Sequence, residues 1–96
     1  MARTNKSAYE RTRFIAMTDD IDAFDLADML MLRQPLIINF EDYHAVKSNQ
    51  VITFLSGIVY AIDGNVEVIR EKVLVFATKE DLKDKSLRKF IKKHKE

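Results

Sequence analysis

The chain has 96 residues, of which 47% are hydrophobic and 32% are charged, a balance typical of one globular domain. Two glycines, one proline and no cysteine exclude fibrous and Pro/Gly-rich disordered classes, glycine-rich phosphate loops, disulfide frameworks and thiolate metal sites. The net charge of +1 conceals an uneven distribution, because residues 16–45 carry seven acids and one base whereas residues 79–96 carry eight bases and four acids. One end of the molecule is therefore expected to be acidic and the other basic.

The first third of the chain predicts an arm, a strand and a helix. Residues 1–12 are mostly polar and lack hydrophobic periodicity, so we expect a flexible arm, and residues 13–17 are typical of a strand. Asp19 and Asp20 are candidate N-caps for the helix that follows, and Pro35 limits its length because the residue before a proline avoids helical backbone. The positions of this helix that should face a core are Ala23, Leu26, Ala27 and Leu30.

The remaining residues predict a strand, a long helix, a hairpin and a basic helix. Residues 36–40 form a short apolar run typical of a buried strand, and a helix is predicted from residue 46 or 49 to residue 60. Residues 66–69 and 73–77 form a predicted hairpin. A basic C-terminal helix, with Ser86 as a candidate cap, is predicted within residues 80–96. Its apolar positions are Leu82, Leu87, Phe90 and Ile91.

The order β-α-β-α-β-β plus a C-terminal helix indicates an α/β fold, an α+β sandwich with two helices on one side of a small mixed sheet. We divide the chain into a flexible arm (1–12), a core domain (13–79) and a basic C-terminal helix (80–96). The longest predicted helix is apolar on more than one face and therefore needs two surfaces against which to bury itself. One is its own sheet, and the other could be a second subunit.

The segment FLSGIVYAIDG, residues 54–64, resembles the signature of the SepF family of cell-division proteins. Residues 22–30 and the strand that begins at Pro35 are also similar to that family, so the resemblance covers about residues 14–78. It implies a non-enzymatic, cytoplasmic adaptor at the division site that binds the C-terminal tail of the tubulin-like protein FtsZ and supports assembly of the division ring and septum. It also implies homodimers that can polymerise, and no cofactor or metal. The family's usual N-terminal amphipathic helix has no counterpart in residues 1–12, which leaves association with the inner face of the membrane open.

The resemblance and the helical spacing together give three sets of candidate residues. Those for the FtsZ tail are Lys47, Gln50, Val51, Phe54 and Leu55. Those for a subunit interface are Gly57, Ile58, Tyr60 and Gly64. Those for membrane contact are Leu87, Phe90, Ile91 and Lys92.

Each set has a structural alternative. Phe54 and Tyr60 could be plain core residues, and Gly57 could permit close packing of the helix on its own sheet. The basic C-terminal helix could simply pack its apolar side on the domain, or could contact nucleic acid or an acidic partner. For His44 and His94 we favour solvated surface positions over metal ligation, because no second ligand lies at ligand spacing.

Two other functions compete with an adaptor. A small nucleic-acid-binding module would use the basic C-terminus, but residues 73–77 lack the aromatic and basic residues of an RNA-binding strand, so we expect no nucleic-acid partner. A regulatory domain that dimerises around a metabolite is the second competitor. An enzyme is the least favoured because no nucleophile–base pair or metal-ligand set is present.

The chain also departs from the family at six residues. Asn49 and Gln50 replace the basic pair before the helix phenylalanine, and Thr53 replaces an acid. Arg33, Arg70 and Lys79 replace two glycines and a proline of the family's turns, so we expect altered turn geometry there.

Overall fold

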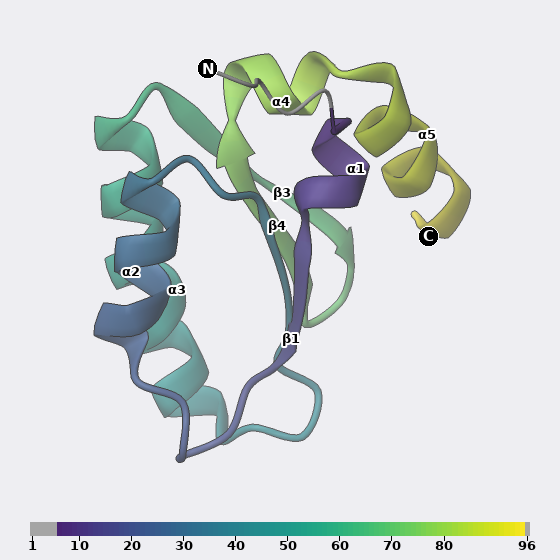
Figure 1. The fold of residues 1–96 in the computed structure, drawn as a ribbon. Helices are drawn as coiled ribbons and strands as arrows, with labels where there is room; N and C mark the ends of the chain where they lie inside the picture. Colours follow the sequence, from purple (N-terminus) through teal and green to yellow (C-terminus); the bar gives the residue numbers. More distant parts are fainter. Residues whose placement is uncertain (1–5, 96) are drawn as a thin grey trace.

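The computed structural model describes residues 6–95, which form a four-stranded mixed sheet (Figure 1). The strands are β1 (Arg13–Ala16), β2 (Leu36–Asn39), β3 (Gly64–Arg70) and β4 (Val73–Thr78). Their order is β1-β2-β4-β3, with β1 parallel to β2 and the other pairs antiparallel. The mixed sheet and the β3–β4 hairpin confirm the predicted α+β sandwich.

Helices α2 (Ala23–Met31) and α3 (Ala45–Ala61) cover one face of this sheet. Leu26, Ala27 and Leu30 are buried as the spacing predicts, and they pack with Leu55 and Phe76 in one core. The N-cap of α2 is Asp22, whose Oδ1 accepts a hydrogen bond from the Phe24 N–H at 2.8 Å. The prediction of Asp19 or Asp20 as the cap is therefore wrong, because the chain still forms a turn at those residues.

The other face is covered by helices from both ends of the chain, α1 (Ala8–Arg11), α4 (Lys79–Lys83) and α5 (Lys85–His94). The flexible arm predicted for residues 1–12 is thus wrong for residues 8–12, where Ala8 is fully buried; residues 1–5 lie outside the described part. A capping box accounts for the helix, since the Ser7 Oγ accepts from the Glu10 N–H while the Glu10 carboxylate accepts from the Ser7 N–H.

The basic C-terminus is two helices rather than one. Asp84 has extended backbone (φ −63°, ψ 129°), ends α4 and caps α5, with its Oδ1 accepting from the Ser86 N–H at 2.9 Å. The N-cap of α5 is therefore Asp84, and the prediction of Ser86 as the cap is wrong. Leu87 and Ile91 are 0% and 1% exposed in the second core, so their assignment to membrane contact is wrong.

The three turn substitutions behave differently from one another. Arg33 adopts the left-handed backbone of a glycine (φ 61°), so the turn there is kept rather than altered. Arg70 ends β3 at a bulge, and the left-handed residue of the hairpin is Lys72 (φ 68°). Lys79 starts α4, because the Thr78 Oγ1 accepts from the Asp81 N–H and caps the helix.

None of the helices in residues 6–95 combines the length and apolar composition needed to cross a bilayer.

Candidate partner-binding face on helix α3

The outward side of α3 is nearly free of charge. The only charged residue in its sequence is Lys47, and none follows until Asp63. Val51, Leu55 and Val59 point into the core, and Ile52, Phe54 and Ile58 are partly buried against it. The outward side is formed by the exposed residues, which include Val46, Asn49, Gln50, Thr53, Gly57 and Tyr60. Val46 and Tyr60 are 60% and 58% exposed, although helix surfaces in contact with water are usually polar.

A shallow hollow lies at the N-terminal half of this face. It is lined by Val46, Asn49, Gln50, Thr53 and Phe54. Phe24 of α2 stands beside it, 69% exposed, and makes an edge-to-face pair with Phe54 (ring centroids 5.3 Å apart). A lining that combines apolar side chains with amide and hydroxyl groups is suited to hold a peptide segment.

The structure brings together some of the candidate tail-binding residues and separates others. Gln50 and Phe54 line the hollow, whereas Val51 and Leu55 are 9% and 0% exposed and support it from the core. The Lys47 Nζ lies 3.2 Å from the Asp19 Oδ1, and this hydrogen bond lowers the pKa of the Asp19 carboxyl. The lysine of α3 therefore already has an anionic partner.

The sequence interpretation missed Val46, Asn49 and Thr53 as lining residues, and Phe24 as their neighbour. Residues 46, 49 or 50, and 53 recur at helical spacing on the side opposite the buried positions, and this spacing could have identified the three residues of α3. Phe24 carries no such signal, because its approach depends on how α2 packs on α3.

The two glycines have different surroundings. Gly57 is exposed, and a Cβ built there would meet no atom within 4 Å, so its alternative role in packing on its own sheet is wrong. Gly64 is buried, and a Cβ there would lie 2.5 Å from the Ala77 carbonyl oxygen and 2.6 Å from the Val59 Cγ2. Gly64 therefore serves packing within the subunit, and its assignment to a subunit interface is corrected. Tyr60 is exposed, while Ile58 is partly buried against the first core.

In the described part of the chain no three or more histidine, cysteine, aspartate or glutamate side chains are grouped so that they could hold a metal ion. His44 caps α3, because its Nδ1 accepts from the Val46 N–H at 3.2 Å. His94 lies against Phe90, with ring centroids 4.3 Å apart.

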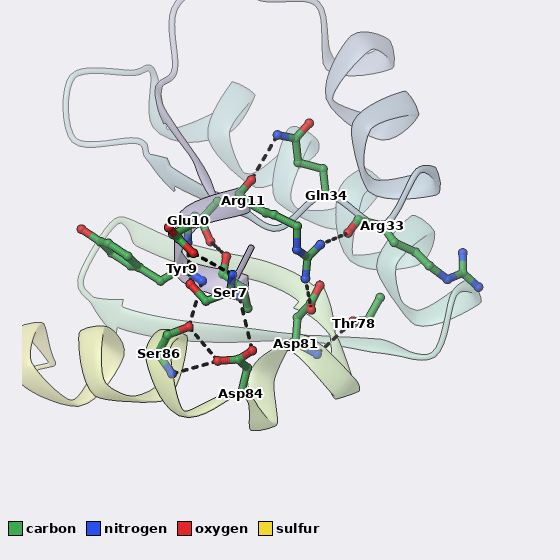
Figure 2. A network of polar contacts seen from close by, with 12 residues as sticks. Ser7, Tyr9, Glu10, Arg11, Arg33, Gln34, Thr78, Asp81, Asp84 and Ser86 are labelled. Carbon is green, nitrogen blue, oxygen red and sulfur yellow. Dashed lines mark hydrogen bonds and ion pairs between the residues drawn. The ribbon is translucent and has the colours of Figure 1, made fainter. Parts of the chain in front are cut away.

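A separate polar network ties the N-terminal segment to α4, α5 and the turn after α2 (Figure 2). Arg11 pairs with the largely buried Asp81 and donates to the Arg33 carbonyl oxygen, while the Gln34 amide donates to the Arg11 carbonyl. The Ala8 N–H donates to the Asp84 carboxylate, whose pKa is lowered mainly by its hydrogen bonds from Ser86. These polar groups are satisfied by one another, so we assign the network a structural role.

These observations define an α/β-sandwich domain with an outward helix face, on α3, that has no charged residue after Lys47. A family model described as Cell division protein SepF matches residues 14–80, and the chain belongs to this family, as its signature segment indicated.

Relatives with the same description support the assignment. The chain is similar to Cell division protein SepF of Ruminiclostridium cellulolyticum (37% identical over 68 residues, 66% of this chain and 44% of that one). It is similar to that of Alkaliphilus oremlandii (31% over 88 residues, 82% and 56%) and to that of Syntrophomonas wolfei (27% over 92 residues, 92% and 65%). The chain spans about half the length of the curated relatives it matches.

Proposed function

We propose that this chain is a non-enzymatic cell-division adaptor of the cytoplasm that binds the C-terminal tail of FtsZ at the division site and forms homodimers. The observation that carries the proposal is the outward face of α3, where a hollow beside Phe54 adjoins a stretch with no charged residue between Lys47 and Asp63. Membership of a cell-division family supports the biological setting.

The tail would lie in the hollow next to the Phe24–Phe54 pair. Phe54 supplies apolar contact, and the side-chain amides of Asn49 and Gln50 can donate to and accept from the peptide backbone. Because Lys47 is already paired with Asp19, apolar and amide contacts would contribute more than charge.

The remainder of α3 would form the homodimer seam. Gly57 and Tyr60 lie outward one turn apart, and an exposed glycine in the middle of a helix costs about 1 kcal/mol relative to alanine. The subunit alone gains nothing from that glycine, which supports close approach of a second helix there.

Titration with FtsZ tail peptide tests the proposal. We expect the wild type to bind with an affinity that changes little with salt, and Phe54→Ala to bind at least about tenfold more weakly, since removal of a buried aromatic anchor commonly costs more than 1.4 kcal/mol. Val68→Ala is the control, because Val68 is an exposed apolar residue on β3 that does not line the hollow, so this variant should leave tail binding unchanged. The proposal fails if folded wild type does not bind, or if both variants lose affinity equally.

A further inference from the structure

Strand β1 has an outer edge that no other strand occupies in residues 6–95. The Arg13 N–H donates to the Pro35 carbonyl (3.0 Å) and the Met17 N–H to the Asn39 carbonyl (2.9 Å), so the odd-numbered residues face β2. Because successive residues of a strand alternate, the backbone N–H and C=O groups of Phe14 and Ala16 point away from the sheet. They are available to a further strand.

This edge is short and begins at the charged Arg13, but it lacks the other usual protections. Arg13, Phe14 and Ala16 are exposed, and β1 contains no proline, lysine or bulge. The opposite edge, β3, differs because a bulge between Val68 and Arg70 interrupts it. The sheet therefore offers one regular free edge, at β1.

Three aromatic rings from distant parts of the chain gather on one side of this edge. Phe14 is 53% exposed and Tyr9 41%, and their ring centroids lie 6.1 Å apart. Phe90 of α5 contacts both, at 5.4 Å from Phe14 and 5.2 Å from Tyr9. An added strand would place alternate side chains on this aromatic cluster.

The surroundings of the cluster are basic. Lys93 follows Phe90 by three residues and so lies on the same side of α5, with Lys89 one turn earlier. The side chain of Arg13 does not add to this charge, because it precedes Phe14 in β1 and points to the other face of the sheet. Two acids lie nearby, and both carboxylates already accept hydrogen bonds: Glu10 accepts from the Ser7 N–H at 2.9 Å, and Asp84 accepts from the Ala8 N–H at 3.3 Å and the Ser86 N–H at 2.9 Å. Pairing of two copies through this edge would bring like charges together, which disfavours a second copy as the occupant.

We propose that the outer edge of β1 binds an extended acidic peptide segment of a partner protein as a fifth strand. Main-chain hydrogen bonds to Phe14 and Ala16 hold the backbone, the aromatic cluster contacts alternate side chains, and Lys89 and Lys93 balance the acidic residues. This surface is separate from the α3 face and does not depend on the proposed tail binding.

The test uses a short peptide in which glutamate alternates with valine and threonine, compared with its lysine counterpart and with a copy N-methylated at alternate backbone nitrogens. We expect only the unmodified acidic peptide to bind and to slow amide exchange at Phe14 and Ala16. Ala16→Pro removes an outward N–H that β2 does not use, so the fold should persist while affinity falls at least about tenfold. Lys89→Glu/Lys93→Glu should also weaken binding, more so at low salt, whereas Lys85→Glu/Lys92→Glu on the other side of α5 makes the same charge change and should weaken it less.

Two results would overturn the proposal. Equal binding of the acidic peptide and its N-methylated copy would mean that charge alone, and not main-chain hydrogen bonding, binds the peptide. This comparison uses the wild-type protein and is therefore valid even if Ala16→Pro fails to fold. Binding of phosphatidylserine–phosphatidylcholine vesicles that is lost in Phe14→Ala but kept in Ala16→Pro, with no peptide binding, would identify a lipid surface instead.

Discussion

Arg33 occupies the position after a helix where glycine is most common. It follows the C-cap Leu32 with φ 61°, its N–H donates to the Leu30 carbonyl (2.8 Å), and the Gln34 N–H reaches back to the Met29 carbonyl (3.0 Å). These two bonds form a Schellman motif, which satisfies the last carbonyls of α2. A non-glycine residue in left-handed backbone costs about 1–2 kcal/mol, so Arg33 at this position lowers the free energy of unfolding.

Arg33→Gly is therefore expected to raise the free energy of unfolding by about 1 kcal/mol, the strain relieved being partly offset by greater freedom of the unfolded chain. Urea unfolding measures the change. Leu32→Gly is the control, because Leu32 is 83% exposed and has φ −85°, so the same residue type is introduced without strain to relieve and stability should fall. An equal gain in both variants would show that the left-handed backbone is not the cause.

At the scale of elements, sequence patterns predicted those whose signal is local. The hairpin, the buried strand β2 and the long helix α3 follow from alternation, an apolar run and helical spacing. Helix α1 was missed because its four residues are too few for a period. It is held by contacts with residues more than seventy positions away, such as the hydrogen bond from the Tyr9 backbone N–H to the Ser86 Oγ. The hollow on α3 was predicted only in part. Phe54 belongs to the segment that resembles the family signature, whereas the position of Phe24 beside it depends on how α2 packs on α3.

An ion pair between Arg88 and Glu67 connects helix α5 to strand β3 of the hairpin. The Arg88 guanidinium donates to both Glu67 carboxylate oxygens, at 3.1 and 2.7 Å, and also to the Leu82 carbonyl at the end of α4. Hydrogen bonding from Arg88 is the main cause that holds the pKa of Glu67 below its ordinary value of 4.5. The pair thereby joins α4, α5 and β3.

Because the pKa of Glu67 is lower in the folded than in the unfolded state, the pair contributes its full stability above pH 4.5 and loses it as the pH falls through the folded value. We expect Glu67→Gln to lower stability at neutral pH and to flatten the decline on acidification, measured as the free energy of unfolding against pH. If Arg88 is the cause, adding Glu67→Gln to Arg88→Gln should change that pH dependence little. A full effect of Glu67→Gln in the Arg88→Gln background would assign the pKa to another neighbour.

Over the whole molecule, the two faces of the sheet are covered by different sets of helices. The helices from both ends of the chain cover one face, and the apolar residues Leu87 and Ile91 of α5 are buried there within the subunit. The other face is covered by α2 and α3, and α3 then presents Val46, Gly57 and Tyr60 outward. The outward face of α3 is therefore the surface on which the proposed homodimer would depend.

Gly57→Lys tests that dependence. Open space surrounds Gly57 within the subunit, and lysine forms helix better than glycine, so the fold and the far-ultraviolet circular dichroism should be unchanged. If the outward face of α3 is the dimer seam, a long charged side chain there blocks close approach of the partner helix, and sedimentation should detect monomers at concentrations where the wild type is dimeric. Val68→Lys, at a 51% exposed position on β3, introduces the same side chain elsewhere and should remain dimeric. Dimers of Gly57→Lys as tight as the wild type would place the seam on another surface.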